Sequence, residues 1–161
     1  MYRPILASLA FILSEDKKNV LMVHRNKRGN DQHLGKYNGL GGKMEAGEDI
    51  LASIIREVQE EAGILCKNVE LRGTVSWPGF GENGEDWFGF IFLVHQYEGT
   101  PYLQNEEGDL HWKCIAELEN LPMWEGDKYF LPLVFDDNPS HFHGSMPYEN
   151  GRPCSWTCSR G

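Results

Sequence analysis

Residues 42–64 constrain the fold of this chain more than any other stretch. Apolar side chains recur there at three- and four-residue spacing, which predicts an amphipathic helix over residues 49–62. Gly63 predicts the end of that helix, since glycine is common just past the last helical turn. Glycines also crowd the segment before the helix, where the backbone can approach a ligand closely; they are Gly39, Gly41, Gly42 and Gly47. The stretch therefore predicts a loop, a helix and a second loop.

The opposite face of the predicted helix is acidic. Glu57, Glu60 and Glu61 stand at i, i+3 and i+4, so their side chains project together and repel one another. Only Arg56 offers an opposite charge close by. Two interpretations follow: a solvated acidic face, or a site for a hard cation such as Mg²⁺, which prefers carboxylate oxygens. Composition does not choose between them.

The spacing of residues 42–64 is more specific than their composition. At each defined position they match the Nudix box, which requires Gly42, Glu48, Arg56-Glu57-Val58, Glu60-Glu61 and Gly63-Ile64. The chain therefore resembles the Nudix hydrolase family. The resemblance implies an α/β/α sandwich with a mixed β-sheet and a catalytic loop–helix–loop. It also implies Mg²⁺ or Mn²⁺ as cofactor, and cleavage of a nucleoside diphosphate linked to another moiety.

The resemblance also implies roles for individual residues. The metal ligands would be the carboxylates of Glu57, Glu60 and Glu61, the Gly41 carbonyl, and an acidic residue on a later loop. By position that later residue is Glu107 or Glu106, and we favour Glu107. The general base would be Glu57 or Glu107. Arg56 would orient Glu60, Glu48 would steady the loop, and Lys43 would approach the phosphates.

The segment Asn38-Gly-Leu-Gly-Gly-Lys43 precedes the box. It resembles the 8-oxo-dGTP diphosphatases of the MutT type, which implies that Asn38 contacts an oxidised purine. An asparagine amide can read a purine edge, although Asn38 beside Gly39 also suits a turn. The same branch implies that Trp124 stacks on the base and that Asp127 hydrogen-bonds it. The branch often has two adjacent acids here, whereas this chain has Gly126 before Asp127.

The implied reaction is hydrolysis of 8-oxo-dGTP to 8-oxo-dGMP and pyrophosphate, which would clear oxidised nucleotides from the pool. Two alternatives stay open at this point. One is a Nudix hydrolase of another substrate, such as ADP-ribose or a dinucleoside polyphosphate. The other is a non-catalytic module that senses a nucleotide. The complete Arg56-Glu-Val-Gln-Glu-Glu61 argues against a sensor, which would not need every metal carboxylate.

Charge and hydropathy limit the partners. A net charge of −9 disfavours nucleic-acid polymers, which bind basic surfaces. A polyphosphate would then need metal ions or local cations, for which Arg25, Lys27, Arg28 and Lys36 are possible sources. No apolar run approaches the about 18 residues of a membrane span. We expect a small-molecule nucleotide as partner, no membrane association, and a monomer or homodimer.

The cysteines indicate a reducing compartment. There are four in 161 residues, too few for a disulfide scaffold, so we expect a cytoplasmic protein. The basic segment before residues 5–13 is a single Arg3 and no small-residue cleavage site follows them, so they predict a buried strand instead of a signal peptide. Cys154 and Cys158, with His141 and His143, allow a zinc site as a minor alternative.

The remaining patterns predict one mixed α/β domain over residues 1–161. Strands are expected over residues 4–13, 19–25, 69–75 and 87–95, with another around Trp112. A second helix is expected near residues 127–134, on the sheet face opposite the first. The tail, residues 136–161, is expected to form a short hairpin around Pro147 to Pro153 or to be only partly ordered.

Overall fold

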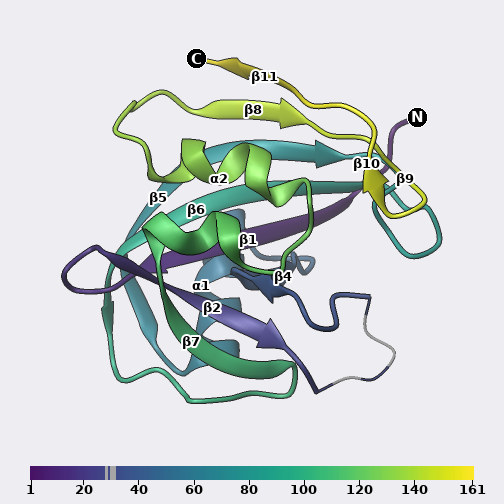
Figure 1. Cartoon of the computed structure of the whole chain (residues 1–161). Helices are drawn as coiled ribbons and strands as arrows, with labels where there is room; N and C mark the ends of the chain where they lie inside the picture. The colour runs from purple at the N-terminus through teal and green to yellow at the C-terminus, as the bar shows by residue number, and fades with distance from the viewer. Residues whose placement is uncertain (28, 30–31) are drawn as a thin grey trace.

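The computed structural model describes residues 1–27, 29 and 32–161. Among these residues, nine strands form one mixed sheet (Figure 1). The strand order is β11-β8-β5-β6-β1-β2-β3, with β4 paired to β1 and β7 paired to β2. The strands are β1 (Ile5–Leu13), β2 (Asn19–Arg25), β3 (Tyr37–Asn38), β4 (Leu40–Lys43), β5 (Leu65–Trp77), β6 (Trp87–Glu98), β7 (Gly108–Cys114), β8 (Phe142–Ser145) and β11 (Thr157–Arg160).

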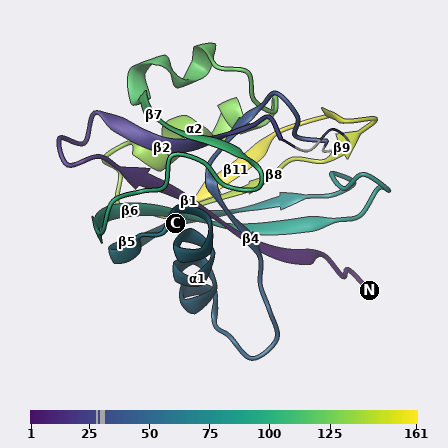
Figure 2. The ribbon, with the colours of Figure 1, turned by 90° about the horizontal axis from the view of Figure 1, so that it is seen from below.

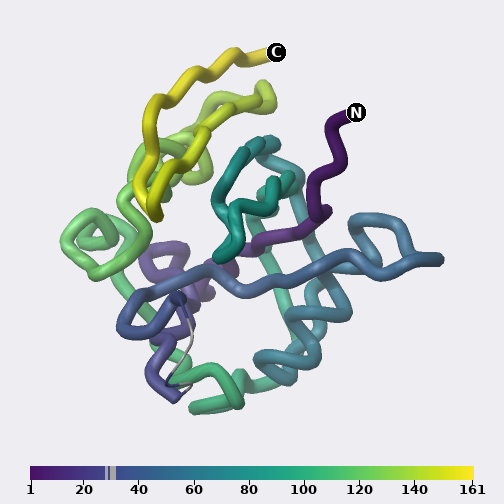
Figure 3. Tube along the Cα trace, turned by 90° about the vertical axis from the view of Figure 1, so that its right-hand side faces the viewer, coloured from purple at the N-terminus to yellow at the C-terminus, as the bar shows by residue number. Residues whose placement is uncertain are grey.

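Two α-helices cover opposite faces of this sheet. Helix α1 (Ile50–Ala62) lies on one face, whereas α2 (Asp127–Phe135) and the 3₁₀ helix η1 (Ile115–Asn120) lie on the other (Figure 2). In the side view of Figure 3, the yellow C-terminal segment lies on the α2 side. The expected α/β/α sandwich is therefore confirmed. No helix among the described residues has the length and apolar character needed to cross a membrane.

The sheet has a core on each face, and strand alternation divides the side chains between them. On β1, Phe11 and Leu13 pack in the core beneath α2, whereas Ala10 and Ile12 pack in the core beneath α1. Side chains alternate across a strand, so a run that is apolar at every position marks a strand buried on both faces. This explains why residues 5–13 form a central strand, paired in parallel with β6.

Local signals at both ends of α1 set its length. The Asp49 carboxylate accepts a hydrogen bond from the Ala52 N–H at 2.8 Å, as an N-cap residue does. At the other end Gly63 adopts a left-handed φ of 70° and its N–H donates to the Gln59 carbonyl at 2.9 Å. The predicted helix thus begins one residue later than expected and ends where expected.

Two predicted strands are longer than expected, and one predicted loop forms a strand. The strand expected over 69–75 spans Leu65–Trp77, and the one expected over 87–95 spans Trp87–Glu98. Register shifts between Cys66 and Val69 interrupt the alternation in β5, which conceals its start in the sequence. Leu40–Lys43, expected as loop, forms β4 against β1. Gly41 permits this pairing, because a Cβ there would collide with the Ser8 carbonyl.

The tail contains more regular structure than expected. Besides a hairpin of β9 (Tyr148–Glu149) and β10 (Arg152–Pro153), it supplies β8, parallel to β5, and β11, antiparallel to β8. The hairpin turns at Asn150 and Gly151, whose φ values of 53° and 78° are both positive. An Asn-Gly pair suits this geometry, which matches the twist of the two strands.

Candidate active site

A cavity of about 360 Å³ opens between β4, the outer ends of β5 and β6, and the start of α2. Its lining combines two kinds of groups. Aromatic rings and polar side chains from the sheet and α2 include Trp77, Phe80, Trp87, Asn38 and Asp127. Backbone and charged groups include Gly41, Gly42, Lys43, Arg25 and Glu107. One cavity thus connects a surface suited to a flat ring with the glycine strand that leads into α1.

Two glutamates of α1 reach the glycine strand from the other side. The Gly41 N–H donates to the Glu61 carboxylate at 3.1 Å. A Cβ at Gly42 would lie 2.7 Å from the Glu57 carboxylate atoms, so the missing side chain makes room for that carboxylate. These two contacts fix Glu57 and Glu61 beside β4. The carbonyl of Gly41, expected as a metal ligand, belongs to the same strand.

The carboxylates here are poorly neutralised. Burial raises the pKa of Glu61 to about 9, and the charges of Glu107 and Glu57 add to the effect. Burial also raises the pKa of Glu57, against the opposing effect of Arg56. Like charges that come close in a buried place disfavour ionisation. A divalent cation would reverse this balance, because it favours the charged form of each carboxylate.

Arg56 connects the loop before α1 to the glutamates on the helix. Its Nη2 and Nε donate to Glu48 at 2.7 and 3.0 Å, a bidentate pair that lowers the pKa of Glu48 to about 2. Its Nη1 donates to Glu57 at 3.0 Å and to Glu60 at 3.3 Å. The contact expected with Glu60 is therefore the longest of these, and the Glu60 side chain remains 60% exposed.

The loop before β7 brings Glu107, and not Glu106, to the cavity. Glu107 lines the cavity and pairs with Arg25 at 3.3 Å, whereas Glu106 is exposed. Asn105 fixes this loop, because its Oδ1 accepts from the Glu107 N–H and its Nδ2 donates to the Glu61 carbonyl at 3.0 Å. Sequence reasoning did not identify Asn105, which shows no local signal for this long-range contact.

The donor set suits a hard divalent cation. Carboxylates from Glu57, Glu61 and Glu107 influence one another electrostatically, and Glu60 acts on Glu57. In the described part of the chain, no three acidic, histidine or cysteine side chains already surround one point at ligating distance. These residues are thus carboxylates of the kind that such a cation prefers, and Arg56 donates to two of them, Glu57 and Glu60.

Of the three residues expected to contact the base, the structure places two in the cavity lining and one outside it. Asn38 and Asp127 both line the cavity, and burial raises the pKa of Asp127 to about 7. Trp124 is not among the lining residues. Its indole N–H donates to His33 Nδ1 at 2.7 Å, and its ring meets Phe80 edge-on at 4.9 Å. It therefore stands behind the cavity wall.

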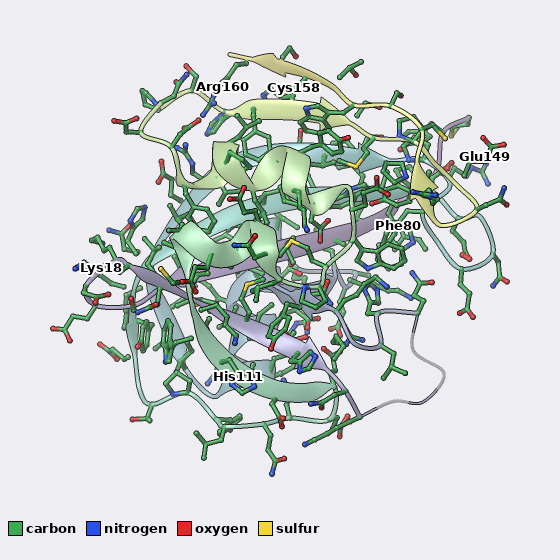
Figure 4. The ribbon with its side chains drawn as sticks, viewed as in Figure 1. Lys18, Phe80, His111, Glu149, Cys158 and Arg160 are labelled. Carbon is green, nitrogen blue, oxygen red and sulfur yellow. The ribbon has the colours of Figure 1, made fainter. Side chains whose placement is uncertain are left out.

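Aromatic rings that the sequence did not single out form that wall. Trp77, Phe80 and Trp87 line the cavity, and Phe80 packs edge-on against Tyr148 with centroids 5.0 Å apart. Figure 4 shows Phe80 close to the C-terminal hairpin. An alternating apolar pattern predicts that such rings are buried, but it does not distinguish a ring in the core from one that faces a cavity.

The basic residues also divide into two groups. Arg25 and Lys43 line the cavity. Lys27 instead donates to Gln104 Oε1 at 2.7 Å and to the Asn105 carbonyl at 2.9 Å, and the Lys36 ammonium lies 4.7 Å from the centre of the Trp124 ring. Arg28 lies outside the described residues. Among the described residues of this basic set, Arg25 and Lys43 are therefore the ones that line the cavity.

The cysteine and histidine residues of the tail considered for zinc are not among the residues that line this cavity. Cys154 and Cys158 are free thiols and are exposed. The other two cysteines, Cys66 and Cys114, are also free but are less exposed. The rings of His141 and His143 stand 6.3 Å apart, and His143 pairs with Thr74 at 2.9 Å. The arrangement of these side chains offers no assembled zinc site within the described ranges.

Comparison with known proteins places this site in a family. Residues 3–134 match the NUDIX domain. The Nudix hydrolase YvcI of Bacillus subtilis is 33% identical over 141 residues, which cover 85% of this chain and 83% of that protein. The chain belongs to the Nudix family, and its enzyme class is that of Nudix hydrolases.

Two further relatives refine this placement. The crystal structure of the MutT protein from Bacillus halodurans has a TM-score of 0.82 and 32% identity, with 96% of this chain and 97% of that chain covered. The oxidized purine nucleoside triphosphate hydrolase of Danio rerio is 33% identical over 100 residues, or 62% of this chain and 63% of the relative. The fold is thus shared over nearly the whole chain, and the sequence likeness to that hydrolase over less than two thirds of its length.

Proposed function

We propose that this protein hydrolyses oxidised purine nucleoside triphosphates, with 8-oxo-dGTP converted to 8-oxo-dGMP and pyrophosphate. One observation carries the proposal: the cavity that holds Asn38, Asp127 and three aromatic rings also holds Glu107 and the glycine strand beside Glu57 and Glu61. A nucleotide bound there would have its base against the rings and its phosphates near the carboxylates. The likeness to relatives named for oxidised purine nucleotides supports this substrate.

The base would be recognised by shape and by hydrogen bonds. The Asn38 amide nitrogen lies in the cavity lining without a partner among the described residues, so it can donate to a purine oxygen. Asp127, with a pKa near 7 in this environment, can donate when protonated and accept when ionised. Trp77 and Phe80 offer aromatic faces, and stacking on a base contributes about 1–3 kcal/mol.

Divalent ions, Mg²⁺ or Mn²⁺, would be held by Glu57, Glu60, Glu61 and Glu107 with the Gly41 carbonyl. When bound, such an ion would neutralise phosphate oxygens and lower the pKa of a water molecule. Arg56 would keep Glu57 in place through its 3.0 Å contact. Arg25 and Lys43 would bind phosphate oxygens at the cavity surface. Glu57 or Glu107 would take the proton of the attacking water.

The setting of this reaction would be the nucleotide pool of a reducing cytoplasm, consistent with the four free thiols. Removal of oxidised purine nucleotides there would prevent their incorporation into DNA. We further propose that residues 1–161 act as one Nudix domain, since the tail packs on the same sheet as the catalytic segment.

Steady-state kinetics over a nucleotide panel tests the proposal. The panel holds 8-oxo-dGTP, dGTP, 8-oxo-dGDP, ADP-ribose and a dinucleoside polyphosphate, each with Mg²⁺ and with Mn²⁺, with pyrophosphate or phosphate release as readout. We expect the highest kcat/KM for 8-oxo-dGTP. A higher kcat/KM for ADP-ribose or a dinucleoside polyphosphate would show that the proposed substrate is wrong. No turnover of any nucleotide in the panel would indicate a sensor.

A matched pair of variants tests the site itself. Glu107→Gln removes a carboxylate from the cavity and Glu106→Gln removes its exposed neighbour. We expect kcat to fall at least about 100-fold in the first, as for loss of a group that acts on the transition state, and less than 2-fold in the second. Similar losses in both variants would reject Glu107 as the functional acid.

A further inference from the structure

Trp87 brings an unpaired hydrogen-bond donor to the cavity. Its indole lines the cavity, and its Nε1–H, shielded from solvent, has no acceptor among the described residues. An indole N–H can only donate, and buried tryptophans usually find a partner for it. The proposed function assigns no partner to this indole N–H.

The contrast with Trp124 shows that this chain does pair an indole where only packing is needed. The Trp124 N–H donates to His33 Nδ1 at 2.7 Å behind the cavity wall. Within the cavity lining, the buried unpaired donors of the described side chains are Trp87 Nε1, Asn38 Nδ2 and the Ser8 hydroxyl. Three unpaired donors on residues that line one cavity indicate that their acceptors come from a ligand, because an unpaired buried donor costs free energy.

The position of Trp87 is set by the sheet. It is the first residue of β6, opposite Trp77 on β5 and beside Ile5 on β1. Two residues on, Gly89 lines the same cavity, and a Cβ there would collide with the Trp77 ring. The Lys43 ammonium lies 5.5 Å from the centre of the Trp87 ring. Trp87 is thus held by paired strands, next to a cation suited to a phosphorylated ligand.

We propose that Trp87 is a substrate-binding residue whose indole N–H donates to an acceptor oxygen or nitrogen of the bound nucleotide. This inference rests on the proposed function, which supplies a nucleotide as the ligand. A purine nucleotide carries acceptors on its base, sugar and phosphates, whereas an apolar ligand would leave both Trp87 and Asn38 without partners. The donors of Trp87 and Asn38 together therefore favour a ligand with at least two hydrogen-bond acceptors.

The variant Trp87→Phe tests this, because it keeps an aromatic ring and removes the N–H. The matched control is Trp112→Phe on β7, where the ring is 37% exposed, stacks on Tyr97 and is absent from the cavity lining. We expect KM for 8-oxo-dGTP to rise about 3- to 10-fold in Trp87→Phe, as for one lost hydrogen bond. We expect kcat to change less than 2-fold, and the control to behave as wild type.

Stability provides a second readout that separates binding from packing. If the N–H has no partner within the protein, Trp87→Phe should unfold at the same temperature as wild type or a higher one. An unchanged KM would overturn the proposal. So would a higher KM in a variant that is partly unfolded at the assay temperature, since the weaker binding would then reflect a loss of the fold.

Calorimetric titration with 8-oxo-dGMP distinguishes this inference from the proposed function. If wild type hydrolyses no oxidised purine nucleotide but binds 8-oxo-dGMP several-fold more tightly than Trp87→Phe, the activity is wrong and the binding role of Trp87 holds. If both bind 8-oxo-dGMP equally, the role of Trp87 fails whatever the activity. If wild type binds no 8-oxo-dGMP and hydrolyses no oxidised purine nucleotide, both proposals are refuted.

Discussion

Replacement of Arg72 by methionine should weaken the fold strongly, because this one side chain holds the end of α2. Arg72 comes from β5 and its side chain is only 4% exposed. It donates to four backbone carbonyls at or just past the end of the helix, which have no partner within it. They are those of Leu133 (3.2 Å), Val134 (3.0 Å), Asp136 (3.1 Å) and Asn138 (3.0 Å).

The size of the effect follows from these contacts. Each hydrogen bond contributes about 0.5–1.5 kcal/mol net, and breaking a buried ion pair costs about 3–5 kcal/mol when a charge is left alone. The Asp136 carboxylate, which pairs with Arg72 at 3.0 Å, is not left alone in the variant, since Arg160 reaches both of its oxygens at 2.8 Å. Methionine also retains much of the apolar stem. We therefore expect Arg72→Met to lose about 3 kcal/mol of unfolding free energy.

Urea denaturation, followed by far-ultraviolet circular dichroism, measures this loss. The control is Arg152→Met, whose side chain is 79% exposed and pairs with Glu125 at 3.6 Å. An exposed pair of this kind contributes about 0–1 kcal/mol, so the control should stay within about 0.5 kcal/mol of wild type. A loss below about 1 kcal/mol in Arg72→Met would refute the assignment of Arg72 as the anchor of the helix end.

Three further predictions concern the site. Glu61→Gln should lower kcat at least about 100-fold without lower stability in the metal-free protein. Burial, with the charges of Glu107 and Glu57, raises the pKa of Glu61 to about 9, so the carboxyl is neutral near pH 7 and glutamine resembles it. Near-normal turnover would reject Glu61 as a metal ligand. KM for 8-oxo-dGTP should rise as pH increases from 6 to 8 if protonated Asp127 donates to the base, since its pKa is about 7, and this dependence should vanish in Asp127→Asn; an equal pH dependence in both would assign it elsewhere. Removal of divalent ions with EDTA should abolish pyrophosphate release, and Mg²⁺ or Mn²⁺ should restore it; activity that persists in EDTA would contradict a metal-dependent reaction.

The elements that the sequence predicted well are those with local signals. Helix α1 has its apolar stripe, an Asp49 cap and a Gly63 stop, all within one short segment. The strands of residues 5–13 and 19–25 are apolar runs separated by a polar turn. Such signals depend on neighbours in the chain, so they survive without knowledge of the tertiary structure.

The parts that sequence reasoning missed depend on distant contacts. β4 forms because Gly41 lets it approach the Ser8 carbonyl, a neighbour far back in the sequence. Trp124 was expected against the base, but its bond to His33 places it behind the wall. Aromatic residues make up 12% of this chain, and contacts between distant segments, such as that of Phe80 with Tyr148, decide which rings line the cavity. Composition and periodicity do not report such contacts between distant segments.

The support of the cavity wall by late residues has a consequence for biosynthesis. The Tyr148 N–H donates to the Pro78 carbonyl and the Met146 N–H to the Ser76 carbonyl, so β9 and the residues before it brace the turn that carries Phe80. A nascent chain emerges with its first residues ahead, and the carboxylates of α1 therefore leave the ribosome long before this brace exists. The proposed ion-binding groups would be exposed earlier than the aromatic surface proposed to select a nucleotide, and that selectivity would be gained only with the final strands.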